Sequence, residues 1–122
     1  MPKRKLDPLP AAAFQIMLSL ADGDLHGYAI MRQVEEQTGG RLRLGPGTLY
    51  GSIQALLEGE LIEEVYRSDD SPDSLDKSVR LERRRYYRLT VAGRDVARAE
   101  AEKMADVLRV ARARKILGED YV

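Results

Sequence analysis

The sequence predicts a mainly α-helical fold with a small β-hairpin, an α+β class in which a compact domain is followed by a long C-terminal helix. A length of 122 residues suits one hydrophobic core rather than two. Apolar residues recur every three or four positions in four segments, which is the period of amphipathic helices. Two further segments are rich in β-branched and aromatic residues and flank a polar stretch, as the strands of a hairpin do.

Composition excludes several classes of protein. Hydrophobic residues make up 43% and charged residues 33% of the chain, which favours a folded domain with an ionic surface over disorder. The chain contains no Cys, so disulfide frameworks, thiolate zinc sites and cysteine nucleophiles are excluded. Its single histidine, His26, cannot form a metal cluster alone, and we expect neither a metal nor a cofactor. No apolar run approaches the roughly 20 residues of a membrane span and a signal-peptide core is missing, so we expect a cytoplasmic protein.

Two short amphipathic helices are expected first. Residues 11–21 carry apolar side chains at helical spacing, and this helix should end near Gly23. Residues 26–38 place apolar side chains on one side and charged ones on the other, before a glycine pair stops the helix. Residues 41–44 alternate between polar and apolar with a period of two, which predicts a short strand.

A third helix is predicted at residues 46–58, with Gly45 as its N-cap and Gly59 at its end. Its buried stripe is apolar and consists of Leu49, Ile53, Leu56 and Leu57. Its opposite face is nearly uncharged, with small or hydrogen-bonding residues, namely Gly47, Thr48, Gly51, Gln54, Ala55 and Glu58. Another surface could therefore approach this face closely. A neighbouring element of the same chain that covers the face is an equally supported interpretation.

Residues 61–67 and 84–90 should pair as a β-hairpin, with the polar stretch 68–83 as its long tip. From Val91 the pattern is helical for about 25 residues. The apolar stripe of this long helix has near-heptad spacing and consists of Ala97, Ala101, Met104, Leu108 and Ala111, beside Val107. Because the preceding domain can already fill its own core, we expect this stripe to pack against a partner chain.

The charges are segregated along the chain, although twenty basic and twenty acidic residues give a formal net charge of zero. Residues 58–76 hold eight acidic residues against one arginine, whereas residues 80–98 hold seven arginines against two acidic residues. Such a basic patch attracts phosphate over about 8 Å, the Debye length at physiological salt. The alternative is a solvated, salt-bridged face, which is the favoured interpretation of a charge run taken alone.

The predicted order is helix, helix, short strand, helix, hairpin and long helix, which is the plan of a winged helix-turn-helix domain. In this plan the third helix enters the DNA major groove, and the hairpin, or wing, reaches the backbone beside it. We expect residues 1–90 to form the DNA-binding domain and residues 91–122 the dimerisation helix. The residues expected in the major groove are Thr48, Tyr50, Gly51, Ser52 and Gln54. Those expected at the DNA backbone, together with the basic N-terminus, are Arg84, Arg85, Arg88 and Tyr28.

Four motifs within residues 10–98 resemble, in order, the signatures of PadR-type transcriptional regulators. They are His26-Gly27-Tyr28, Gly47-Thr48-Leu49-Tyr50, Leu61-Ile62-Glu63 and Tyr86-Tyr87-Arg88-Leu89-Thr90. The resemblance implies a homodimeric repressor that binds an operator with dyad symmetry, and whose C-terminal helix packs against the partner's N-terminal helix. It assigns no small-molecule effector, because the chain has no Trp and one Phe for stacking a ligand. Gly51 stands where the family often has Pro, and Gly45 where it commonly has Ser, so the third helix should start less rigidly.

Several of these side chains have a structural interpretation beside the functional one. Tyr50 either touches phosphate or packs on the second helix, and core packing is the favoured role of Tyr28. His26 is expected to cap or pack the start of its helix rather than to bind a ligand. Tyr86 and Tyr87 alternate across a strand, so one of them should face the core.

The wing arginines could instead form salt bridges with Glu63 and Glu64 across the hairpin.

At the level of function, an enzyme needs a nucleophile with its base, a metal cluster or paired carboxylates in a pocket, and the sequence supplies none of these convincingly. A winged-helix adaptor that binds another protein and no DNA is the alternative function. Salt-dependent binding to duplex DNA would separate a regulator from such an adaptor.

Overall fold

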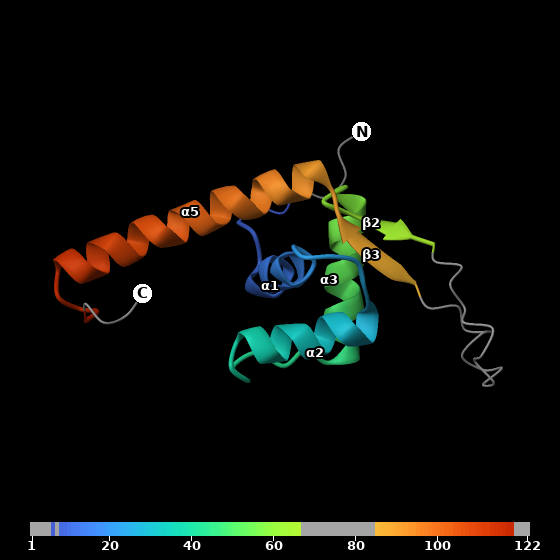
Figure 1. Cartoon of the computed structure of the whole chain (residues 1–122), viewed down its shortest axis with the longest axis horizontal. Coiled ribbons are helices and arrows are strands. Elements are labelled where there is room, and N and C mark those ends of the chain that lie inside the picture. Colours follow the sequence, from blue (N-terminus) through green and yellow to red (C-terminus); the bar gives the residue numbers. More distant parts are fainter. Residues whose placement is uncertain (1–5, 7, 67–84, 119–122) are drawn as a thin grey trace.

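A computed structural model describes residues 6, 8–66 and 85–118. In chain order its elements are α1 (Ala11–Ser19), β1 (Leu25–His26), α2 (Gly27–Gln37), α3 (Pro46–Glu58), β2 (Ile62–Val65), β3 (Tyr86–Leu89) and α5 (Val91–Ala113). Figure 1 shows α1, α2 and α3 gathered into one body beside the small sheet, while α5 starts at that body and runs out beyond it. The predicted α+β class, mainly helical with a small β-hairpin, is confirmed.

The helices begin where a side chain accepts a hydrogen bond from the first free N–H groups, or where a proline lacks such a group. His26 caps α2, because its Nδ1 accepts a hydrogen bond from a backbone N–H of the first turn at 3.2 Å. Thr90 caps α5, and its hydroxyl oxygen accepts from the N–H of Gly93 at 2.9 Å. α3 begins with Gly45 at its N-cap and Pro46 in its first turn. The predicted capping role of His26 and the predicted bounds of α3 are confirmed.

The sheet has three antiparallel strands in the order β1-β3-β2. β2 and β3 form the predicted hairpin, with Ile62 opposite Leu89. β1 was not predicted from the sequence, and its Leu25 pairs with Tyr87 on the other edge of β3. β3 is therefore the central strand, with a neighbour on each side.

The short strand predicted at residues 41–44 is wrong. Leu42 is half-buried and Leu44 is buried, whereas Arg41 and Arg43 are exposed, so the alternation reflects one buried side of the segment rather than a sheet. A strand needs a pairing partner, and residues 41–44 are not part of the sheet, whose strands within the described residues are β1, β3 and β2. The segment is held instead by Thr38, whose hydroxyl accepts a hydrogen bond from the N–H of Leu42 at 3.1 Å.

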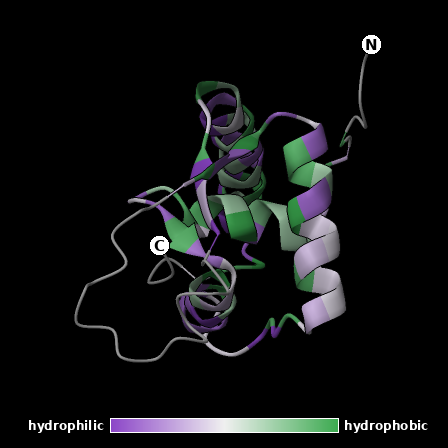
Figure 2. Cartoon of the chain, turned by 90° about the vertical axis from the view of Figure 1, so that its right-hand side faces the viewer, coloured by the Kyte–Doolittle hydropathy of each residue, from purple (hydrophilic) through white to green (hydrophobic). Residues whose placement is uncertain are grey.

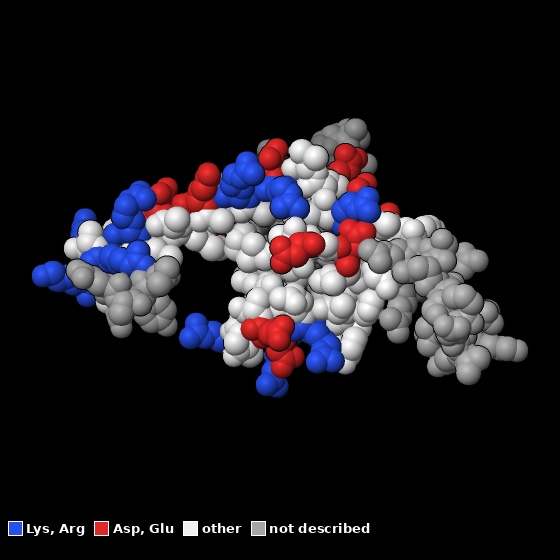
Figure 3. All heavy atoms as spheres, viewed as in Figure 1, with Lys and Arg blue, Asp and Glu red and all other residues white. Residues whose placement is uncertain are grey.

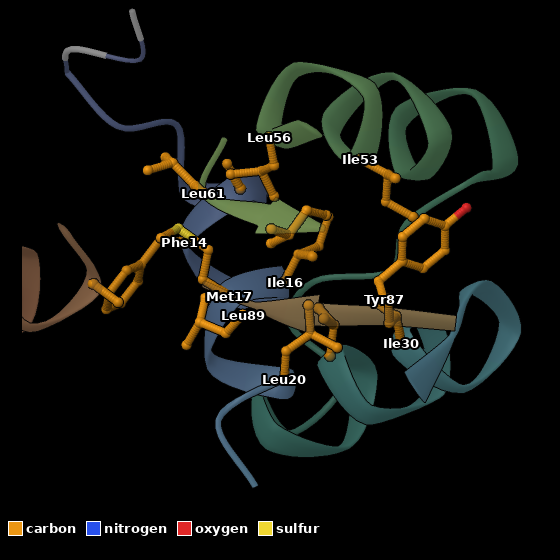
Figure 4. Packing of buried hydrophobic residues seen from close by; sticks show 14 of the residues in the cluster. Phe14, Ile16, Met17, Leu20, Ile30, Ile53, Leu56, Leu61, Tyr87 and Leu89 are labelled. Atoms are coloured by element: carbon orange, nitrogen blue, oxygen red, sulfur yellow. The ribbon is translucent and has the colours of Figure 1, made fainter. Parts of the chain in front are cut away.

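The hydrophobic core is centred on α1, which packs against α2, α3 and α5. Ile16 and Met17 of this helix are fully buried. Figure 4 shows side chains from α1, α2, α3 and β3 meeting in the same interior, among them Leu56 of α3 and Leu89 of β3. α1 ends at Ser19, before the expected end near Gly23, and the hydroxyl of Ser19 donates a hydrogen bond to the carbonyl oxygen of Ile16 at 2.6 Å.

α5 belongs to this core only at its beginning, where Gly93 and Ala97 are buried. The burial of Ala97 corrects its assignment to the dimerisation stripe, because this side chain already packs in the core of its own chain. From Ala101 to Val110 every residue is exposed. Although α5 is long, neither it nor any other helix within the described residues is apolar enough to cross a membrane.

Candidate nucleic-acid interface

The uncharged face of α3 is open along the first turns of the helix. Gly47, Thr48, Gly51 and Gln54 are exposed, and we call these four residues the α3 ridge. A Cβ added at Gly47 or Gly51 would meet nothing within 4 Å. Ser52 beside them is half-buried. Within residues 8–66 and 85–118, no part of the chain covers the glycines of the ridge, which argues against the interpretation that a neighbouring element covers this face.

The α3 ridge is narrower than the sequence indicated. Ala55 was expected on the open face, yet its side chain is only 6% exposed. Leu57 was expected in the buried stripe and is half-buried. Ala55 is buried because α3 packs against α1, α2 and β2, which together surround more than one side of the helix. Figure 2 shows the lower turns of the upright helix α3 in pale colours, between hydrophilic and hydrophobic.

Tyr50 packs on the second helix, which is one of the two roles that the sequence left open. Its ring rests on Gly27 at the start of α2, where an added Cβ would lie 2.6 Å from the tyrosine hydroxyl oxygen. The residue is nevertheless 53% exposed. The ring therefore packs on the second helix with one side and leaves the other available. This contact also brings two of the sequence motifs, one at residues 26–28 and one at residues 47–50, to the same place.

Tyr28 is at the surface. It is 58% exposed, and the guanidinium carbon of Arg32 lies 5.9 Å from the centre of its ring, as in a cation–π pair. The favoured interpretation of Tyr28 as a core residue is therefore wrong. The residue stands on the exposed side of α2, next to the glycine on which Tyr50 rests.

The two neighbouring tyrosines of β3 behave as the strand period requires. Tyr87 is buried and Tyr86 is half-buried, so one of the pair faces the core as predicted. The ring of Tyr86 meets that of His26 edge to face, with 5.4 Å between ring centres. This contact joins the cap of α2 to the central strand.

Both wing arginines that the structure describes are paired with carboxylates. Arg85 Nε lies 3.4 Å from Glu64 Oε2, which is one of the salt bridges that the sequence offered as an alternative. Arg88 pairs instead with Asp24, in the loop before β1, through Nε to Oδ1 at 3.1 Å and Nη2 to Oδ2 at 3.0 Å. The hydrogen bond from Arg88 and the negative charge of Asp24 raise the pKa of the guanidinium, so Arg88 is fully charged.

Asp24 was missed by sequence analysis, since only the pairing of β1 with β3 places it beside Arg88. Arg84, the basic N-terminus at residues 3–5 and the wing tip lie outside the described residues. Figure 3 shows lysines and arginines interleaved with acidic residues along α5, and no single basic face on the side displayed.

The arrangement defines a class of protein. α2 and α3 form a helix-turn-helix packed on α1, α3 leaves an uncharged ridge open, and a β-hairpin stands beside it. This is a winged helix-turn-helix protein.

Comparison with known proteins identifies the family. The family model described as "Transcriptional regulator PadR-like family" matches residues 16–99. The chain is 36% identical over 94 residues to a 37.1 kDa protein of a Streptomyces fradiae transposon, an alignment that covers 77% of this chain and 23% of that protein. The chain thus spans less than a quarter of the length of this curated relative.

Solved structures agree with the family. A PadR family transcription regulator from hypervirulent Clostridium difficile is 26% identical, with a TM-score of 0.70 over 89% of this chain and 100% of that one. Bacillus subtilis PadR in complex with operator DNA is 19% identical and has the same fold, with a TM-score of 0.62 over 78% of this chain and 48% of that one. The chain belongs to the PadR-like family of transcriptional regulators.

Proposed function

We propose that the chain is a sequence-specific DNA-binding regulator, and that it acts as a homodimeric repressor on an operator with dyad symmetry. The observation that carries the proposal is the α3 ridge, which is uncharged, open at Gly47 and Gly51, and flanked by the hairpin. A B-DNA major groove about 12 Å wide admits one helix, and small residues allow its backbone to come close to the bases. The chain would regulate transcription rather than catalyse a reaction. It would act in the cytoplasm, where the DNA it controls lies.

Each predicted contact has a role in this proposal. The neutral hydrogen-bonding groups of α3 would meet base edges or nearby phosphates, namely Thr48, Tyr50, Ser52 and Gln54, with Gly51 allowing close approach. Tyr28 and the wing arginines Arg84, Arg85 and Arg88 would contact the backbone. Phosphate contacts of this kind give affinity and orientation, whereas base contacts give sequence preference.

Residues 91–122 would form the dimer interface and residues 1–90 the DNA-binding domain. From Ala101 to Leu108 the apolar side of α5 has no cover within the described chain, since Met104, Val107 and Leu108 are 43%, 66% and 40% exposed. Ala101 is exposed and Ala111 half-buried on the same stripe. A two-fold pair of such helices would set two α3 ridges at successive major grooves, about 34 Å apart for half-sites one helical turn from each other.

One observation favours the alternative function, an adaptor that binds protein and no DNA. Arg85 and Arg88 are both engaged by carboxylates, and a paired guanidinium offers less net charge to phosphate. The adaptor would use the exposed stripe of α5 for its partner.

Binding to fluorescent duplexes of random sequence, measured by anisotropy at rising salt, tests the proposal. A regulator should bind at low salt and lose affinity with a log–log slope of about 0.9 per phosphate contact, whereas an adaptor should bind no duplex. Selection from random duplexes should then enrich an inverted repeat. Gly51→Glu should abolish the selective binding, because a carboxylate on the α3 ridge faces the DNA. Ala99→Glu, which adds the same charge at an exposed position of α5, is the matched control and should bind as the parent chain does.

A further inference from the structure

Asp24 holds the guanidinium of Arg88 with two hydrogen bonds. Arg88 Nε reaches Oδ1 at 3.1 Å and Nη2 reaches Oδ2 at 3.0 Å, so the contact is bidentate. The two residues are 64 positions apart in the sequence. A bidentate carboxylate is also the closest protein counterpart of a phosphate group, because both offer two oxygens to the same edge of the guanidinium.

The sheet register places Arg88 between two carboxylates. Leu25 is opposite Tyr87, so Asp24 occupies the next position along, opposite Arg88 on the β1 side. On the β2 side, Glu63 is directly opposite Arg88. Residues directly opposite each other on antiparallel strands share one face of the sheet. The positive charge of Arg88 thus has a carboxylate on each side, Asp24 and Glu63, and both raise the pKa of Arg88.

The two partners differ in their access to solvent. The side chain of Asp24 is 12% exposed, whereas that of Arg88 is 51% exposed. The loop that carries Asp24 is also fixed by Arg94, whose Nη2 donates a hydrogen bond to the carbonyl oxygen of Ala21 at 3.1 Å. The carboxylate is therefore held in place beneath the sheet edge, while the guanidinium has an outer side that a phosphate could reach.

We propose that Asp24 competes with DNA phosphate for Arg88 and so lowers the affinity of the wing for any duplex. The inference rests on the proposed function, and it adds a residue that tunes the interface without touching DNA. Arg88 would exchange one bidentate oxygen partner for another, and the poorly solvated Asp24 opposes this exchange because it would lose the two hydrogen bonds that Arg88 donates.

Removal of the carboxylate charge tests the proposal. Asp24→Asn keeps the size of the side chain, and it should bind a duplex of random sequence about threefold to fivefold more tightly than the matched control. The control is Asp22→Asn, which changes the net charge equally at an exposed position of the same loop. The same substitution in an Arg88→Ala background should give no gain over the control, because the effect acts through the guanidinium.

The outcomes separate this inference from the proposed function. If the parent chain binds no duplex at low salt, the proposed function is wrong. A parent chain that binds, with Asp24→Asn equal to Asp22→Asn or with a gain that survives Arg88→Ala, would overturn the role of Asp24 and leave the function standing.

If Asp24→Asn does not fold, NMR of the parent chain tests whether Arg88 changes its partner when DNA binds. The Nε–H resonance of Arg88, assigned by its loss in Arg88→Ala, should move when the chain is saturated with duplex. A resonance that stays at its position in the free protein means that Arg88 keeps its carboxylate partner, and the proposal is then wrong.

Discussion

At the level of single residues, Tyr87 shows how the core controls protonation. Its ring is 4% exposed and lies at the centre of the sheet. Burial raises its pKa above the ordinary value of 10.0, the charge of Glu64 adds to this effect, and Arg85 opposes it. The neutral phenol is therefore favoured in the folded chain. Its contribution to stability is complete below the ordinary tyrosine pKa and is lost as pH rises through the higher value in the folded state.

This linkage predicts an alkaline effect that depends on Tyr87. The unfolding free energy of the parent chain should fall as the pH rises above the ordinary tyrosine pKa of 10.0, and that of Tyr87→Phe should fall less, since Phe does not ionise. Chemical denaturation at a series of pH values measures the difference. Tyr66→Phe is the control, because Tyr66 is 80% exposed and should leave the alkaline loss unchanged. Equal slopes for the parent and Tyr87→Phe would contradict the argument.

At the level of elements, the start of α5 is fixed against the start of the hairpin by two neighbouring contacts. Thr90 hydrogen bonds to the carbonyl oxygen of Leu61 at 3.0 Å while it caps α5. One turn later, Gly93 lies against the same carbonyl, so closely that a Cβ would overlap it. The obstacle is backbone, which cannot move aside as a flexible side chain can. Glycine at this position therefore sets the distance between α5 and the residues that lead into β2.

Gly93→Ala should lower the unfolding free energy by at least about 2 kcal/mol, because the overlap outweighs the better helix propensity of Ala. Gly23→Ala is the control, since a Cβ there would meet nothing within 4 Å, and it should change stability by less than about 1 kcal/mol. Urea denaturation measures both. Equal stability of the two variants would show that α5 can shift away from the hairpin without cost.

At the level of the whole molecule, α5 is the element whose apolar side chains are least covered by the rest of the described chain. Its first turns pack in the core, and the next ten residues, Ala101 to Val110, are exposed on all sides. An isolated amphipathic helix gains most of its stability from packing, and an uncovered apolar stripe is an association surface. In the proposed dimer, packing against the partner chain would stabilise this part of α5 as a helix.

Leu108→Glu should weaken the proposed dimer at least about tenfold, because a carboxylate would be buried in the interface. Val110→Glu is a close control: it is 53% exposed, two residues away, and about 200° around the helix from Leu108. Sedimentation at several concentrations should show the first variant dissociating before the second. Two variants with the same association constant as the parent would argue against the α5 stripe as the interface.

Part of the fold and of the interface could be predicted from the sequence because its determinants are local. The third helix follows from Gly45 and Pro46 before it and Gly59 after it, and the hairpin from two short β-rich segments. Residue size and charge alone indicated the uncharged character of this face of α3, but they left open whether a neighbouring element covers it. The short strand at residues 41–44 failed for the opposite reason, since alternation describes an extended chain and cannot supply a pairing partner.

The sequence alone therefore determined the helices, the hairpin and the small, uncharged character of the α3 ridge, since caps, glycine stops and hydrophobic period act over a few residues. Only the tertiary structure decided which side of α3 is closed at Ala55, that Ala97 belongs to the core, and that Asp24 meets Arg88. These three facts depend on which distant segments come together. Such contacts arise from packing the whole chain around α1, and no local pattern encodes a partner 64 residues away.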